Sequence, residues 1–184
     1  MTRRLFLAIP CPTEVRDYLE KLKEVNKDIS GIKWMRPHNL HLTVYFMGNT
    51  KKEDFDKIIT TVLPIINSQE KFILEFDKIC FAPTKRPKMI WARFHKNNSF
   101  TQLVNLIHGA LKAIIPPDKF YYEEPVPHIT LARFHPIKEI ESINIQPQPQ
   151  LSQIHFTSCQ LWESRSSQDG VKYENVAPVF YLKK

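Results

Sequence analysis

The spacing of apolar residues divides the chain into short strands and three helices. Alternation with polar residues, or a short apolar run, predicts strands at residues 3–9, 32–35, 41–46, 71–81, 89–94, 128–134, 151–163 and 171–182. Helical spacing begins after Thr13, which we expect to cap the first helix, and recurs over residues 55–62 and 100–114. Gly48-Asn49-Thr50 and Pro116-Pro117 are expected to end the strand and the helix that precede them.

The order of these segments favours an α+β fold with antiparallel sheets. The strands at 71–81 and 89–94 form one predicted hairpin, whose tip is basic, and the last two strands form another through Asp169-Gly170. Hairpins between successive strands are typical of antiparallel sheets, whereas a doubly wound parallel sheet alternates strands with helices. A chain of 184 residues is long enough for one substantial core, so we expect a single domain over residues 1–184.

Two of the predicted strands carry the same short motif. His41-Leu42-Thr43-Val44 and His128-Ile129-Thr130-Leu131 each read histidine, apolar, threonine, apolar. Because side chains alternate along a strand, each histidine shares a face with its threonine, and the apolar residues point the other way. One copy would be weak evidence, since threonine is common in strands and histidine is often half-buried. Two copies predict two similar halves whose motifs face one site.

Composition narrows the class of partner. Hydrophobic residues make up 42% of the chain and charged residues 24%, as in ordinary soluble globular proteins, and no apolar run approaches the ~20 residues of a membrane span. The net charge of +7 favours a polyanionic partner such as nucleic acid. Cys11, Cys80 and Cys159 are widely spaced, which predicts free thiols in a reducing compartment. We therefore expect a cytoplasmic protein.

The residues of the motifs favour acid–base chemistry over other kinds of catalysis. Neither motif has the histidine or cysteine spacing of a zinc site, and neither contains a carboxylate, although a metal that bridges His41 and His128 stays an open alternative. No Gly-x-Ser-x-Gly sequence occurs, and no cysteine is near either motif in the sequence. The chain has only four glycines and no glycine-rich nucleotide loop. We predict no metal and no cofactor.

Two histidines on one face suit the cleavage of a phosphodiester. In-line displacement at phosphorus needs a base at the incoming oxygen and an acid at the leaving oxygen, and histidine, with a pKa near ~6.5, serves in either role around neutral pH. The hydroxyls of Thr43 and Thr130 would hydrogen-bond the non-bridging oxygens. A strained five-membered cyclic phosphate is a suitable substrate. These arguments leave open which histidine is the acid.

The paired motifs and their surroundings resemble the 2H phosphoesterase superfamily. Within it, the chain is most similar to the bacterial and archaeal RNA 2′,3′-cyclic phosphodiesterases, also called 2′-5′ RNA ligases. The resemblance covers nearly the whole chain. It is carried by the opening strand at residues 4–10, the first motif with its flanks at 34–48, the second motif at 127–133, and the closing hairpin at 161–164 and 170–173.

The resemblance implies a bilobal α+β fold with two antiparallel sheets facing a central cleft and helices outside. It also implies metal-free hydrolysis of RNA 2′,3′-cyclic phosphate ends, for example on tRNA fragments, to 2′-phosphate. We accordingly expect a monomer without membrane or obligate protein partners. In the family's scheme His41 is the general acid that protonates the departing 3′ oxygen, and His128 is the general base that activates water. Thr43 and Thr130 hold the phosphate.

Two further candidates each lie five positions after a motif histidine. Arg133 matches the family's arginine and is expected to neutralise phosphate charge, and Phe46 is expected to stack on a base. Regular alternation puts each of them on the opposite strand face from its histidine, so a bulge is needed to bring either into the site. The basic tip at residues 85–88 is either an RNA contact or a solvated turn, and the role of the aromatic, acidic segment 121–125 stays open.

Two other functions fit the same residues. The first is a nucleotide- or RNA-binding module that kept the cleft without turnover, although the intact histidines and threonines favour an enzyme. The second is a phosphodiesterase that acts on 2′-5′ oligonucleotides or small cyclic nucleotides. Comparing binding with turnover separates the first from the RNA-end enzyme, and a panel of substrates separates the second.

Overall fold

The computed structural model describes residues 1–115, 124–134, 140–146, 152–168 and 170–183. These residues form ten β-strands and three α-helices. The helices are α1 (Thr13–Val25), α2 (Phe55–Ser68) and α3 (Asn98–Leu111). The strands are β1 (Thr2–Pro10), β2 (Ile32–Trp34), β3 (His41–Lys51), β4 (Phe72–Ala82), β5 (Met89–Phe94), β6 (His128–Phe134), β7 (Gln153–Phe156), β8 (Ser158–Ser167), β9 (Gly170–Asn175) and β10 (Phe180–Tyr181).

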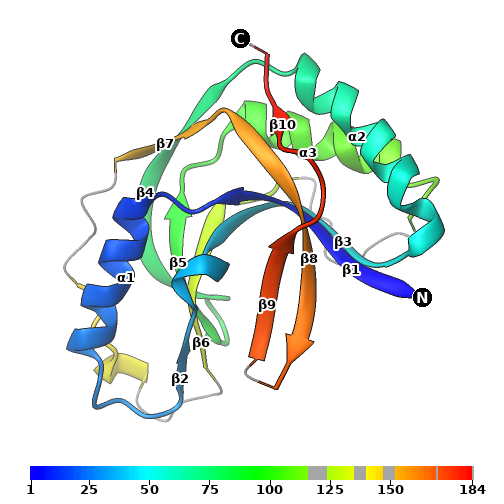
Figure 1. Ribbon diagram of the computed structural model, residues 1–184. Helices are drawn as coiled ribbons and strands as arrows, with labels where there is room; N and C mark the ends of the chain where they lie inside the picture. The colour runs from blue at the N-terminus through cyan, green and yellow to red at the C-terminus, as the bar shows by residue number, and fades with distance from the viewer. Residues whose placement is uncertain (116–123, 135–139, 147–151, 169, 184) are drawn as a thin grey trace.

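All of these strands belong to one curled antiparallel sheet (Figure 1). Its order is β10-β8-β1-β3-β6-β5-β4-β7, with β2 beside β6 and β9 beside β8. The half built on β8, β1 and β3 meets the half built on β6, β5 and β4 through a single residue pair, Leu42 and Ile129. The predicted α+β class with antiparallel strands is confirmed, and the two expected lobes are the two halves of this sheet.

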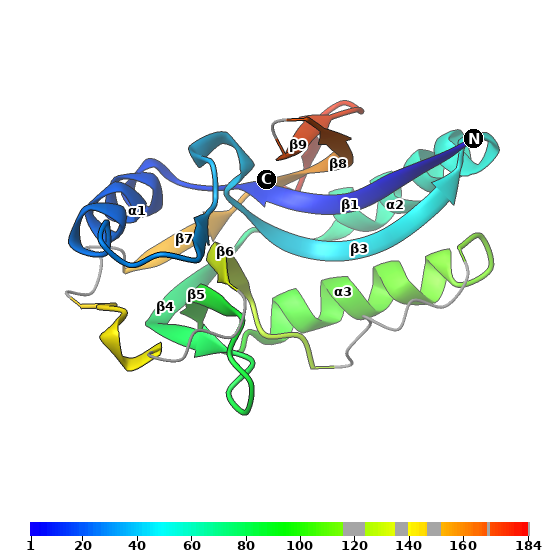
Figure 2. The same ribbon diagram turned by 90° about the horizontal axis from the view of Figure 1, so that it is seen from below.

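The helices cover the sheet by their apolar stripes. In α1 the buried side chains are Val15, Tyr18, Leu19 and Leu22, the spacing expected of a helix with one face toward the core. Helices α2 and α3 pack against each other, α3 runs alongside β3, and α1 lies at the opposite end of the molecule (Figure 2). No described helix combines the length and the apolar character needed to cross a bilayer.

Two of the predicted boundaries are wrong, namely the start of α1 and the end of β3. Thr13 is the first residue of α1, and the residue before it, Pro12, is the extended cap; no side chain caps this end. The strand β3 does not end at Gly48 but continues to Lys51. Gly48 has a φ of 70°, which glycine tolerates, and a register shift beside it lets the pairing with β1 continue.

The two segments predicted as the last long strands are each divided. Residues 151–163 were expected to form one strand, but β7 pairs with β4, and after Thr157 the chain crosses so that β8 pairs with β1. The return segment 171–182 is likewise split into β9 and β10, which lie on either side of Pro178, a residue that lacks the N–H that a continuous ladder needs. The first error arises because the two parts of segment 151–163 pair with different strands. The spacing of apolar residues does not indicate which strand a segment will pair with.

Candidate active site

The two motif strands lie side by side and bring both histidines and both threonines to one face of the sheet. Leu42 is paired antiparallel with Ile129, and both side chains are buried. Continued by one residue, this register sets His41 opposite Thr130 and Thr43 opposite His128. All four side chains line one cavity of about 570 Å³. The predicted convergence of the motifs is therefore what the structure shows.

A bulge in each motif strand brings Phe46 and Arg133, the residues five positions after the motif histidines, to the same cavity. The register of β3 with β1 skips Val44, and the register of β6 with β5 skips Leu131. Each skipped residue lies three positions after its motif histidine. One extra residue shifts the alternation, so that the residue five positions after the histidine returns to the histidine's face. Phe46 and Arg133 consequently line the cavity.

Both imidazoles are anchored in the same way. Nδ1 of His41 lies 2.7 Å from the carbonyl oxygen of Asn39, and Nδ1 of His128 lies 2.8 Å from that of Val126. A carbonyl only accepts, so Nδ1 carries the hydrogen in both rings, and Nε2 is the nitrogen available to a substrate. Oγ1 of Thr43 lies 3.1 Å from Nε2 of His41 and donates to it when the ring is neutral.

Aromatic side chains surround both histidines. Around His41 the ring centroids of Phe6, Tyr173 and Trp162 lie at 4.9, 5.0 and 5.4 Å, and Tyr173 meets the imidazole edge-on at 88°. His128 stacks on Trp91, with centroids 3.7 Å apart and an interplanar angle of 19°. These contacts fix the ring planes and cover part of each imidazole. They come from four strands, β1, β5, β8 and β9.

This enclosure favours the neutral form of both imidazoles. Burial lowers the pKa of His41 to about 4; the Asn39 carbonyl opposes the shift, whereas the charges of His128 and Arg133 reinforce it. Burial is also the largest cause that lowers the pKa of His128, again opposed by its carbonyl partner and reinforced by Arg133. A bound anion would favour the charged ring and so oppose this lowering of the pKa.

The charged groups at the cavity suit an anionic ligand. The guanidinium of Arg4 lies 5.1 Å from the ring centroid of Phe46, and Nη1 of Arg133 lies 3.3 Å from the sulfur of Met89. No carboxylate among the described residues forms an ion pair with either arginine, and the described lining contains no acidic side chain. Within the described parts of the chain, no three histidine, cysteine or acidic side chains are grouped to hold a metal ion.

Asn39 connects the first histidine to the closing hairpin. Its side chain is 3% exposed; Nδ2 donates to the carbonyl oxygen of Val171 at 2.7 Å, and Oδ1 accepts from the backbone N–H of Tyr173 at 3.2 Å. Its own carbonyl holds His41. One buried residue thus holds the imidazole through its backbone carbonyl and, through its side-chain amide, the strand that carries Tyr173.

Sequence reasoning missed the residues that surround the histidines. Phe6, Tyr173 and Trp162 lie in segments that carried the family resemblance, but no local spacing links them to His41. They reach it because β1 pairs with both β3 and β8, and β9 pairs with β8. Of the aromatic, acidic segment, residues 121–123 lie outside the described residues, whereas Pro125 lines the cavity beside Val126. The tip at residues 85–88 does not line it.

Comparison with known proteins points to one family. Residues 9–91 match the family model described as LigT like Phosphoesterase. An RNA 2′,3′-cyclic phosphodiesterase of Methanocaldococcus jannaschii is 32% identical over 133 residues, which are 71% of this chain and 70% of that protein. A protein of the same name from Aquifex aeolicus is 27% identical over 135 residues, again 71% of this chain and 70% of that protein.

Solved structures share the fold across the whole chain. The TT0787 protein of Thermus thermophilus superimposes with a TM-score of 0.81 at 23% identity and covers 98% of both chains. Escherichia coli LigT in its apo form gives a TM-score of 0.78 at 20% identity over 100% of this chain and 99% of LigT. A complex of LigT with 3′-AMP gives a TM-score of 0.76 at 22% identity and covers 100% of both chains.

Replacing Asn39 by alanine should destabilise the fold. The change removes two partly buried hydrogen bonds to the backbone of β9, each worth about 0.5–1.5 kcal/mol, and so costs about 1–3 kcal/mol of unfolding free energy. Denaturant unfolding measures this loss. Asn175→Ala is the matched control, since Asn175 is exposed and bonds only the nearby Ala177 N–H at 3.4 Å; we expect a change within about 0.5 kcal/mol. Equal losses in the two variants would contradict the role given to Asn39.

Proposed function

The chain belongs to the LigT-like phosphoesterase family, and we propose that it hydrolyses 2′,3′-cyclic phosphate ends of RNA to 2′-phosphate ends. The names of its relatives support this reaction. The observation that carries the proposal is the convergence of two histidines, each anchored through Nδ1, and two threonines on one cavity. That arrangement supplies an acid, a base and a phosphate cradle from two equivalent strands.

The proposed reaction is an in-line displacement at phosphorus. Nε2 of His128 removes a proton from water as the water oxygen attacks, and Nε2 of His41 gives its proton to O3′ as the P–O3′ bond breaks. The products are a 2′-phosphate and a free 3′-hydroxyl. Afterwards His128 carries the proton taken from water and His41 is neutral, and proton exchange with solvent restores both rings. Because each proton has its own imidazole, the step needs no metal.

The neighbouring side chains have complementary tasks in this proposal. The hydroxyls of Thr43 and Thr130 donate to the non-bridging phosphate oxygens, and Arg133 neutralises their charge. Phe46, on the His41 side, stacks on the terminal base. The two equivalent positions after the motifs thus differ in chemistry, with an aromatic ring in one half and a cation in the other. Such asymmetry orients a substrate that has a base at one end and a phosphate at the other.

The two alternative functions, a binding module and a phosphodiesterase for other substrates, can be compared with this proposal. A binding module would not require that both imidazoles be anchored through Nδ1, the arrangement that reserves Nε2 for a reacting oxygen, yet both rings are anchored in this way. A phosphodiesterase for 2′-5′ oligonucleotides or small cyclic nucleotides would use the same acid and base. A panel that includes these compounds beside an RNA with a cyclic end distinguishes the substrate classes.

Removing either histidine should abolish most of the turnover. We expect His41→Ala and His128→Ala each to lower kcat by about 10²–10⁴-fold, because each takes away one proton transfer. Thr43→Val and Thr130→Val should each lower kcat by about tenfold to a hundredfold through loss of a donor to the phosphate. Product release from a cyclic-phosphate oligonucleotide measures all four variants.

The control for these variants is His38→Ala. His38 is exposed, lies three positions before His41 and is not part of the cavity lining. Its replacement should change kcat by less than about twofold. Full activity in either motif-histidine variant, with the fold intact by circular dichroism, would rule out the acid–base pair.

The pH dependence should differ between the free enzyme and the complex. Since the pKa of each histidine is lowered by burial, the form with one charged and one neutral ring is most populated below pH ~6.5. The pH optimum of kcat/KM should therefore lie below pH ~6.5, and kcat/KM should fall as the pH rises above the optimum. A bound phosphate anion raises the pKa of the acid, so the alkaline limb of kcat should lie about one pH unit higher. If the pH profiles of kcat and kcat/KM coincide and both have an optimum above pH ~7.5, the two histidines do not have the lowered pKa values described here.

A further inference from the structure

Two positive side chains lie directly opposite each other at the edge of the cavity. Lys33 of β2 is paired with Arg133 of β6 in an antiparallel register, and Arg133 is paired in turn with Met89 of β5. Paired residues of antiparallel strands point to the same face of the sheet. Arg133 lines the cavity, and so does Met35, two residues after Lys33. Lys33 therefore belongs to the cavity face, one strand away from Arg133.

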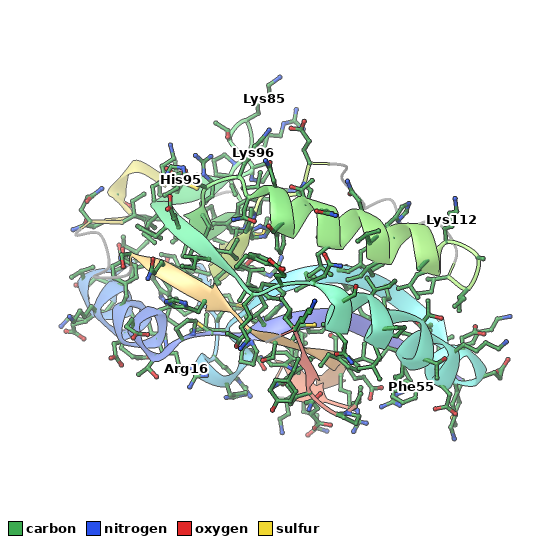
Figure 3. The ribbon with its side chains drawn as sticks, turned by 90° about the horizontal axis from the view of Figure 1, so that it is seen from above. Arg16, Phe55, Lys85, His95, Lys96 and Lys112 are labelled. Atoms are coloured by element: carbon green, nitrogen blue, oxygen red, sulfur yellow. The ribbon has the colours of Figure 1, made fainter. Side chains whose placement is uncertain are left out.

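More cations follow on the neighbouring hairpin. The backbone N–H of Phe134 donates to the carbonyl oxygen of Lys88 at 2.9 Å, which holds the base of the β4–β5 hairpin tip against the end of β6. The tip adds Lys85 and Arg86, both exposed, and Figure 3 shows Lys85 pointing away from the body of the protein. We define the cationic ledge as Lys33, Lys85, Arg86, Lys88 and Arg133.

No acidic side chain among the described residues forms an ion pair with any member of this ledge. Elsewhere on the same hairpin Arg93 is paired with Asp77, and Lys96 nearby is paired with Glu124, so neutralisation does occur around the ledge. Like charges directly opposite each other on two strands are destabilising. Their placement at the edge of an anion-binding cavity is explained by a ligand that brings further negative charge.

We propose that the cationic ledge binds the phosphodiester backbone of an RNA chain whose terminal cyclic phosphate occupies the cavity. The inference rests on the proposed function and adds the substrate class: an oligonucleotide is preferred over a cyclic mononucleotide. A nucleoside 2′,3′-cyclic phosphate has its one phosphate at the histidines and none for Lys33 or the hairpin tip. Each added phosphodiester gives the ledge a negative partner, and the resulting affinity depends on salt.

The test compares two substrates with the same terminal nucleoside. One is adenosine 2′,3′-cyclic monophosphate and the other is a pentanucleotide ending in adenosine 2′,3′-cyclic phosphate. Wild-type kcat/KM should be higher for the pentanucleotide and should fall more steeply with salt. Lys33→Gln should lower kcat/KM for the pentanucleotide about fivefold and reduce its log–log salt slope by about 0.7, the value for one single-strand phosphate contact. Its kcat/KM for the mononucleotide should stay within about twofold of wild type.

Two further variants test whether position matters. Lys85→Gln combined with Arg86→Gln removes the outer end of the ledge and should also lower kcat/KM for the pentanucleotide alone. Lys112→Gln removes the same charge from the C-terminal end of α3, where Lys112 is exposed and far from the hairpin tip (Figure 3). It should leave both substrates unchanged.

The outcomes distinguish failure of the RNA contact proposed for the cationic ledge from failure of the proposed function. If wild type hydrolyses neither substrate, the proposed function fails. If it hydrolyses both and Lys33→Gln lowers both equally or neither, the reaction stands and the ledge is overturned. A loss in Lys112→Gln equal to that in Lys33→Gln would also overturn it, because net charge alone would then account for the effect.

Discussion

The structure depends on one backbone pairing between its two halves. Leu42 and Ile129 are the single point at which β3 and β6 are joined in register, and both side chains are buried in the core. A slip by one residue would turn every motif side chain to the other face, placing the histidines in the core and leucine and isoleucine in the cavity. Burial of this apolar pair therefore fixes the register, and the register brings the four polar side chains together.

Around that point the protein holds both imidazoles in fixed orientations and lowers the pKa of each. Backbone carbonyls hold Nδ1 of both histidines, and aromatic rings enclose them. Holding an imidazole in this way preserves its direction without placing a carboxylate beside it, which would attract positive charge before the substrate arrives. In the proposed reaction the anionic substrate supplies the charge that raises the pKa of the acid, so that proton transfer becomes possible in the complex.

Sequence patterns predicted the helices and most strands because these depend on local periodicity, and they predicted the convergence of the motifs because the same motif occurs twice. The positions of Phe46 and Arg133 depend on bulges after Thr43 and Thr130, which the side-chain alternation does not reveal. The enclosure of His41 depends on the pairing of β1 with β8, which is a long-range choice. No local pattern indicates a role for Lys33, since the role inferred for it depends on its pairing with Arg133 on another strand.

The most direct test of the central claim is the chemical identity of the product formed in the presence of excess chelator. Purified protein is incubated with a short RNA that ends in a 2′,3′-cyclic phosphate, and the product end is identified by its sensitivity to phosphatase and its mass. We expect a 2′-phosphate at an undiminished rate, since in the proposed mechanism His41 protonates O3′ and no metal takes part. A 3′-phosphate would reverse the roles of the two histidines, and turnover that stops with chelator and returns with a divalent cation would contradict the two-histidine mechanism.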